Sequence, residues 1–142
     1  MITEKDIKTR ISEILTDNGF NAVASEVKEG FRKPAVFVSV MPASARLLTC
    51  GGATEEITDS VELKYITETE TDEECIDAAN KFKRIFLYNT FDIDDRHITV
   101  SEIEFDVENS VLYTYFEITF IRIVETDEEY EAMEALMIGG NV

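Results

Sequence analysis

The sequence predicts an α+β domain, a mostly antiparallel β-sheet flanked by helices in the order α-β-β-(β-β)-α-β-β-α. Two observations indicate this class. Amphipathic stretches with helix-start signals alternate with groups of strand-like segments, and neighbouring strand segments are joined by short turns rather than by crossover helices. With 142 residues, of which 44% are hydrophobic, the chain is long enough for one domain with a substantial core. We expect this domain to span residues 1–138 and to end in a frayed tail at 139–142.

The first element is an amphipathic helix. Thr3 is a suitable N-cap, Asp6 stands at the capping-box position, and Asn18–Gly19 is a stop signal. Apolar residues then recur at i, i+4, i+7 and i+8, which places them on one stripe. The predicted core positions of this helix are Ile7, Ile11, Ile14 and Leu15.

Strand-like segments follow this helix. Residues 20–27 predict a strand, 28–30 a turn, and Ala35–Val40 a β-branched, largely buried strand that begins after Pro34. Beyond Pro42 the pattern weakens, and we expect a separate long hairpin in which residues 44–50 and 57–67 are joined through Gly51–Gly52. In its second arm, alternation places one set of residues toward the core: Val61, Leu63 and Tyr65.

The second helix is predicted to start at Thr71, with a capping box to Glu74 and acidic residues in its first turn. Its expected buried stripe consists of Ile76, Ala79, Phe82, Ile85 and Phe86. The same Thr-Asp-Glu-Glu tetrapeptide at residues 126–129 predicts a third, shorter helix that ends near Met137.

The strongest hairpin signal lies between these last two helices. Segments 100–108 and 111–124 flank Asn109–Ser110, and a two-residue loop there pairs Ile103 with Phe116, Phe105 with Thr114 and Val107 with Leu112. The same register pairs Glu102 with Glu117, Glu104 with Tyr115 and Asp106 with Tyr113. One face of this hairpin is then almost entirely apolar. The other carries tyrosines and an acidic row that consists of Glu102, Glu104, Asp106 and Glu108.

The charge is strongly one-sided, because 30 Asp and Glu stand against 13 Lys and Arg, a net charge of −17. Phosphate binding requires clustered basic residues, so a conventional nucleic-acid reader is disfavoured. No apolar run approaches the roughly 18 residues of a membrane span, and the N-terminal residues do not resemble a secretory signal, so we expect a cytoplasmic site of synthesis. Cys50 and Cys75 have no metal-site spacing and are interpreted as small buried apolar residues.

The best candidate for chemistry is the segment Asp92–His97, which holds three carboxylates and the only histidine. A hard cation or a His–carboxylate acid–base pair is conceivable there. However, the segment lacks the glycine of an EF-hand loop and the three ligands of a zinc site, and we favour an acidic connection that Arg96 partly neutralises. The chain also lacks a nucleophile elbow and a phosphate-binding glycine loop. We therefore predict no enzymatic activity, no cofactor and no metal.

Tyr113 and Tyr115 lie on the nominally solvent-exposed side of the last hairpin, within a rim of acidic residues. This combination is typical of protein interfaces, although tyrosines with solvated hydroxyls and a solubilising acidic surface are the simpler alternatives. The scattered basic residues include two groups that would complement such a face. The residues that we select from them as candidate subunit contacts are Arg32, Lys33, Lys83 and Arg84.

The order of elements resembles a known family. The opening helix, the strand that follows Lys33–Pro34, a long polar hairpin, a central helix, a second hairpin and a short last helix are similar to the tail terminator (tail completion) proteins of tailed bacteriophages and prophages. The resemblance covers nearly the whole chain and rests on size and element order rather than on a diagnostic motif. It implies a non-catalytic virion structural protein that acts in viral tail assembly. Such proteins form a ring, expected to be a hexamer, that caps the tail tube and stops its polymerisation.

The resemblance also implies the partners: further copies of the chain, the tail-tube protein and a neck or head-completion protein. The expected location is the tail of the virion, after assembly in the cytoplasm of the host bacterium. DNA would pass through the ring without specific binding, and an acidic surface suits that passage because it repels phosphates. Three alternatives stay open: another phage neck or head-completion protein, an acidic inhibitor that mimics DNA, and a metal-dependent enzyme that uses the segment Asp92–His97.

Overall fold

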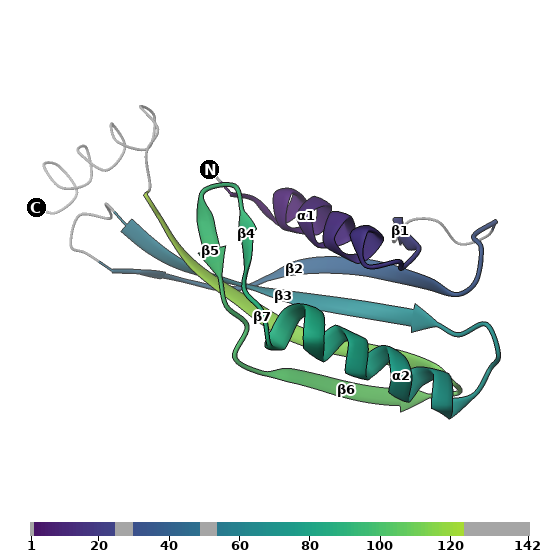
Figure 1. Cartoon of the computed structure of the whole chain (residues 1–142). Helices are drawn as coiled ribbons and strands as arrows, with labels where there is room; N and C mark the ends of the chain where they lie inside the picture. The colour runs from purple at the N-terminus through teal and green to yellow at the C-terminus, as the bar shows by residue number, and fades with distance from the viewer. Residues whose placement is uncertain (1, 25–29, 49–53, 124–142) are drawn as a thin grey trace, which may run out of the picture.

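The computed structural model describes residues 2–24, 30–48 and 54–123, and it confirms the predicted α+β class. A five-stranded sheet in the order β1-β2-β3-β7-β6 carries both helices on one side, and a two-stranded sheet, β4-β5, lies beside it (Figure 1). All neighbouring strands are antiparallel except β1 and β2. The elements are α1 (Glu4–Asp17), β1 (Ala22–Ala24), β2 (Ala35–Leu47), β3 (Thr54–Ile66), α2 (Asp72–Phe82), the π-helical turn η1 (Lys83–Leu87), β4 (Phe91–Ile93), β5 (Arg96–Ile98), β6 (Ile103–Glu108) and β7 (Val111–Ile123).

Helix α1 forms as predicted. Its capping box is reciprocal, because the Asp6 amide donates to Thr3 Oγ1 at 3.3 Å and the Thr3 amide donates to Asp6 Oδ2 at 2.9 Å. The predicted stripe is the buried stripe of the helix: Ile7, Ile11, Ile14 and Leu15. The helix ends at Asp17, and Gly19 then takes a φ of +88°, a left-handed conformation that glycine adopts without strain.

Helix α2 departs from the prediction in two respects. Thr71 caps it, but Glu74 does not complete a capping box. Its carboxylate instead accepts hydrogen bonds from the amides of Glu68 and Thr69 and from the Tyr65 hydroxyl, so it fastens the preceding loop to the sheet. The second difference is the buried stripe, which is Cys75, Ala78, Phe82 and Phe86.

Ile76 is 58% exposed, so its predicted place in the core was wrong. It lies one residue, or about 100°, around the helix from the small Cys75, and that residue faces the sheet instead. Ala79 and Ile85 are only half-buried. The prediction of a buried, unpaired cysteine is confirmed for Cys75, whereas Cys50 lies outside the described residues.

Strand β2 is longer than predicted. Residues 35–40 and the first arm of the expected separate hairpin form one continuous strand, which pairs with β3 along its whole length. A bulge between Pro42 and Ser44 bends the strand without ending it. The predicted order therefore contains one strand too many before α2, and the Gly51–Gly52 tip lies outside the described residues. Beyond α2, Asp92–His97 belongs to the β4-β5 hairpin rather than to a plain connection.

The register of the β6-β7 hairpin is confirmed. Ile103 pairs with Phe116, Phe105 with Thr114 and Val107 with Leu112. Asn109 and Ser110 both have positive φ values, 53° and 60°, as a two-residue hairpin turn of the primed type requires. Because β6 begins only at Ile103, the predicted pairing of Glu102 with Glu117 is not part of the ladder.

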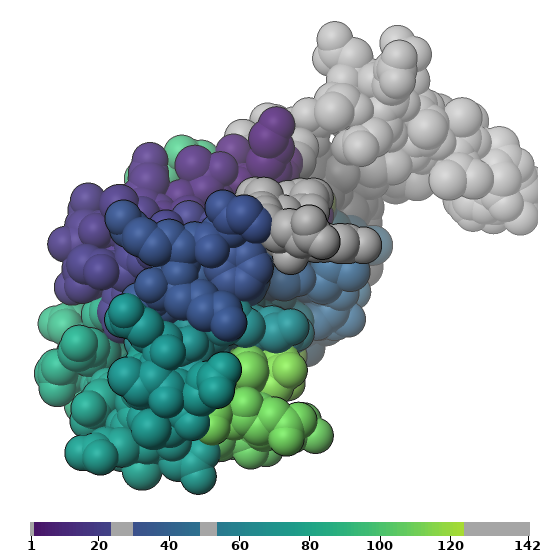
Figure 2. Space-filling model, turned by 90° about the vertical axis from the view of Figure 1, so that its right-hand side faces the viewer, coloured from purple at the N-terminus to yellow at the C-terminus, as the bar shows by residue number. Residues whose placement is uncertain are grey.

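The two faces of the sheet differ sharply. On β7 the buried residues alternate with more exposed ones, and the buried set faces the helices: Leu112, Thr114, Phe116, Ile118 and Phe120. Aromatic rings pack the helix layer against the sheet, with Phe82 6.3 Å from Tyr65 and Phe86 5.1 Å from Phe116 between centroids. Viewed along the sheet, α1 (purple) and the α2 region (teal) lie toward one side, and the β6-β7 hairpin (yellow-green) lies toward the other (Figure 2).

Several predictions lie outside the described residues: the end of the first strand at 25–27, most of the turn at 28–30, the third helix and the C-terminal tail. Among the residues that are described, no helix combines the length and hydrophobicity that a membrane crossing requires.

Candidate functional site

The face of the sheet opposite the helices carries the predicted acidic row. Glu104, Asp106 and Glu108 are exposed on β6, and they pair with Tyr115, Tyr113 and Val111 of β7. Strand β3 continues the same rows with Glu62 beside Tyr115 and Lys64 beside Tyr113. We call this surface the acidic sheet face and define it by these residues: Glu62, Lys64, Glu104, Asp106, Glu108, Tyr113, Tyr115 and Glu117. It holds five carboxylates and one ammonium group.

The two tyrosines have different surroundings. The Lys64 ammonium lies 5.9 Å from the centroid of the half-buried Tyr113 ring, which is a cation–π contact. Tyr115 is 39% exposed. Partial burial and the nearby carboxylates of Glu62 and Asp106 raise the pKa of its hydroxyl above the usual value. Tyr115 therefore keeps its proton at any physiological pH and offers a ring with a hydrogen-bond donor in an acidic setting.

A hollow of about 350 Å³ adjoins Tyr115. Three glutamates line it, Glu102, Glu104 and Glu117, together with Ser60 and Ser101. Glu102 is thus placed beside the acidic sheet face even though it is not paired in the ladder. In the described part of the chain, no group of three or more acidic, histidine or cysteine side chains is arranged to hold a metal ion.

The basic candidates lie apart from the acidic sheet face. Arg32 and Lys33 are exposed in the segment that precedes β2, where the Arg32 carbonyl accepts a hydrogen bond from the Asn21 side chain at 2.7 Å. Lys83 and Arg84 belong to η1, in the helix layer. Lys83 and Arg84 therefore lie on the side opposite the acidic row, and Arg32 and Lys33 precede β2, which β3 and β7 separate from β6. We expect contact between the basic residues and the acidic row to form between two copies.

The segment Asp92–His97 forms a tight hairpin with the left-handed Asp94, φ 52°, in its turn. His97 Nδ1 lies 2.7 Å from Asp92 Oδ1, and both side chains are about two-thirds exposed. Arg96 lies 3.7 Å from Asp95, so it partly compensates the acidic residues as predicted. Solvent screens exposed ion pairs of this kind, so each contributes little to stability. The arrangement is that of a surface hairpin.

The sequence analysis does not identify a buried carboxylate on β3. Asp59 is fully buried on the helix side of the sheet, and neither of its oxygens receives a hydrogen bond within the described chain. Burial, together with the adjacent Glu4 carboxylate, raises its pKa from 3.8 to about 6, against the opposing effect of Arg122. Alternation within residues 57–67 places Asp59 on the apolar side, and that placement was the available signal.

Glu62 and Lys64 were also missed as members of the acidic sheet face. Alternation with Val61, Leu63 and Tyr65 places them on the polar side of β3, but the hairpin pattern alone does not reveal that β3 pairs with β7. That neighbour relation unites the polar side of β3 with the tyrosines and the acidic row.

Comparison with known proteins identifies one family. A family model described as "Phage tail terminator protein" matches residues 6–130, which include all the described strands and both helices except the first two residues of α1. No curated protein matches the chain.

Proposed function

Because the chain belongs to the phage tail terminator family, we propose that it completes the phage tail as a ring that caps the tail tube, stops its polymerisation and joins it to the head or neck. The ring is a hexamer in this proposal, and the protein has a structural rather than a catalytic role. It resides in the tail of the virion after assembly in the host cytoplasm.

The acidic sheet face is the observation that carries the proposal beyond the family. Five carboxylates lie on a strand surface that neither described helix covers. A ring around the DNA path needs a lining that phosphates do not bind, and a negative surface supplies it by repulsion. We therefore orient the β6 row, Glu104, Asp106 and Glu108, toward the channel.

Ring closure requires a contact between two different patches of the same chain. The basic groups Arg32, Lys33, Lys83 and Arg84 lie away from the acidic sheet face, so those of one subunit can meet the tyrosine side of that face on the next. Tyr113 and Tyr115 then lie near the subunit contact. This placement suits tyrosine, which is enriched at interfaces, and it leaves the charged residues at the rim.

The first experiment measures solution mass by light scattering and images the same sample by negative stain. Six chains of 16.1 kDa weigh about 97 kDa, and rings of that mass with a central hole are expected. The same protein is then added to polymerising tail tubes, where capping should shorten them. A protein that neither forms rings nor changes tube length would refute the proposal. If that protein instead bound a basic nuclease or repressor, it would be an acidic inhibitor.

A further inference from the structure

One end of the sheet consists of its three central strands alone. Strands β2, β3 and β7 each have 13 residues, whereas β6 has six and β1 three, so the central strands continue past both edge strands. We call this projecting part the sheet arm and define it as residues 41–48, 54–60 and 117–123. It extends to the left of α1 in Figure 1. At about 3.3 Å per residue, it is roughly 20 Å long.

The sheet arm concentrates exposed apolar side chains. Of the nine large hydrophobic residues that are exposed in the described chain, five belong to it: Met41, Leu47, Leu48, Ile121 and Ile123. Both faces are involved. Ile121 and Ile123 alternate with the buried Phe120 and so lie on the side away from the helices, whereas Leu47 pairs with Glu55 on the helix side.

An arm of three strands with apolar residues on both faces is an uncommon surface for a monomer. Exposed apolar patches of this kind mark interaction sites, because burying them is favourable and leaving them in water is not. On the helix side the arm is buried as far as its middle, at Ile57 and Phe120, but all of Met41–Leu47 is exposed. The arm therefore has the properties of an element that another chain covers.

The charge of the sheet arm favours a second copy of this chain as the covering chain. The arginines of the arm are matched to its acids: Arg46 lies 3.1 Å from Glu56, and Arg122 lies 2.7 Å from Glu55. Asp59 is buried, which leaves Glu117 at the root as the remaining exposed acid of the arm. In a chain with a net charge of −17, this is a part that another copy can approach without strong repulsion.

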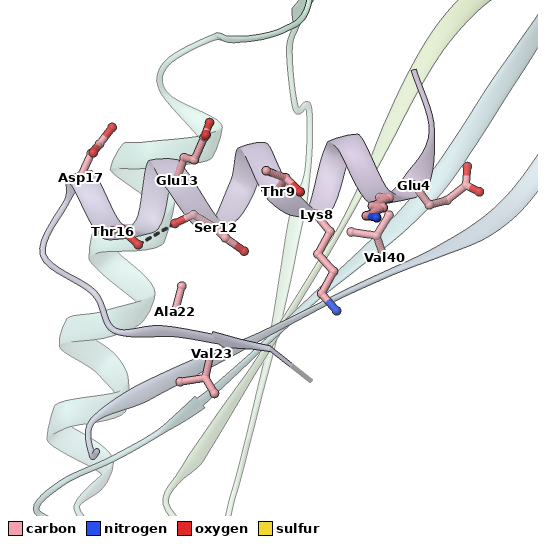
Figure 3. A pocket seen from close by; sticks show the side chains of 11 residues that line it. Glu4, Lys8, Thr9, Ser12, Glu13, Thr16, Asp17, Ala22, Val23 and Val40 are labelled. Carbon is pink, nitrogen blue, oxygen red and sulfur yellow. Dashed lines mark hydrogen bonds between the residues drawn. The ribbon is translucent and has the colours of Figure 1, made fainter. Parts of the chain in front are cut away.

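A suitable receiving surface lies along α1. A groove of about 830 Å³ runs between this helix and the β1–β2 edge, and half-buried Ala22, Val23 and Val40 contribute apolar surface to it. In Figure 3 the side chains of Lys8 and Ser12 point from α1 toward these strands, whereas the Thr16 hydroxyl donates back to the Ser12 carbonyl. Two lysines and three acids line the groove, so its charge is nearly balanced. The groove and the arm are different patches, as a ring contact requires.

We propose that the sheet arm of one copy docks into the α1 groove of the next copy. This inference rests on the proposed ring, and it adds a specific apolar contact that the ring could lack. The exposed arm residues become buried in the assembly, and the groove is filled by a neighbour's side chains.

Cysteine cross-linking tests the contact directly. In a Cys50→Ser background, copies that carry only Leu47→Cys on the arm are mixed with copies that carry only Thr9→Cys in the groove. Mild oxidation should link the two variants to each other, and the mixture should assemble to the same mass as the wild-type protein. As a control, Ile76→Cys replaces Leu47→Cys, because Ile76 is similarly exposed, 58% against 62%, but lies on α2. The control pair should not link. The mixtures are tested alone and on tail tubes.

Assembly provides the second readout. The double variant Ile121→Ser with Ile123→Ser should shift the mass from ring to monomer with an unchanged circular dichroism spectrum, whereas Ile76→Ser should form rings. If wild-type rings form, but the arm variant also forms them and no arm-to-groove link appears, the docking is refuted and the ring stands. If wild type forms no ring in solution or on tubes, both proposals fail.

Discussion

The buried Asp59 carboxylate should weaken the folded state at neutral pH, and Asp59→Asn should remove that cost. Its side chain is fully buried, accepts no hydrogen bond in the described chain and adjoins the Glu4 carboxylate. Two carboxylates cannot hydrogen-bond to each other unless one of them holds a proton. Asparagine has nearly the same shape, carries no charge, and its amide N–H can donate to Glu4.

The magnitude follows from the pKa of Asp59, which burial and Glu4 raise from 3.8 to about 6. At about 1.4 kcal/mol per pKa unit, ionised Asp59 lowers the free energy of unfolding by about 3 kcal/mol. The sign is that of an acid with a raised pKa in the folded state. The cost is absent below pH 3.8, the pKa of Asp59 in the unfolded chain. It grows as pH rises toward about 6, the pKa in the folded chain, and is complete above that pH. Asp59→Asn should therefore stabilise the protein by about 2–3 kcal/mol at pH 8 and by about half as much at pH 5.

Urea unfolding followed by circular dichroism at pH 5 and pH 8 measures both values. Asp77→Asn is the matched control, because Asp77 is exposed on α2 and its neutralisation should change stability by less than about 0.5 kcal/mol at either pH. An Asp59→Asn protein that is no more stable than wild type at pH 8 would refute the reasoning. So would a gain that is equal at both pH values, since that would reflect packing rather than ionisation.

Three further variants test other parts of the structure. Glu74→Ala should cost about 1–2 kcal/mol at pH 7 after allowance for solvent screening, with Glu73→Ala nearly neutral. Partial burial opposes the charge of Glu74, but hydrogen bonds from the preceding loop hold its pKa at about 2. The stability that Glu74 contributes should therefore be lost as pH falls from 4.5 through 2, which urea titrations measure. Leu15→Ala should cost about 3–4 kcal/mol in the same assay, because Leu15 is fully buried. Glu104→Lys with Asp106→Lys should impair ring assembly or tail-length control; unchanged rings and tails would contradict the proposed roles of these residues.

Local signals predicted the elements that depend on local physics. The stripe of α1 needed only spacing and a cap, and the β6-β7 register needed only a two-residue turn between alternating strands. Pro42 shows where such signals mislead. A proline normally argues against a continuing strand, yet β2 passes through it, because no described strand lies beside β2 beyond Val38 and a missing N–H on that edge costs little.

Tertiary context decided the rest. Sequence spacing favoured Ile76 for the core, but the small Cys75 lies against the sheet, and the larger side chain is left exposed. Glu74 stands at a capping-box position, yet the loop before α2 offers it better donors. Glu62 and Lys64 belong to the acidic sheet face because β3 pairs with β7. The periodicity within one segment does not show which strands are neighbours.

The two proposed subunit contacts predict opposite responses to salt. If complementary charged patches dominate, raising salt from 0.1 M to 1 M shortens the screening length from about 10 Å to 3 Å and should dissociate rings. If apolar docking of the sheet arm dominates, salt should favour rings, because it screens repulsion between copies that each carry −17 and leaves apolar burial intact. Ring mass measured against salt therefore ranks the contacts, and the Ile121→Ser, Ile123→Ser variant identifies the arm. Rings that dissociate with salt and tolerate this variant would show that charge, rather than the arm, holds the subunits together.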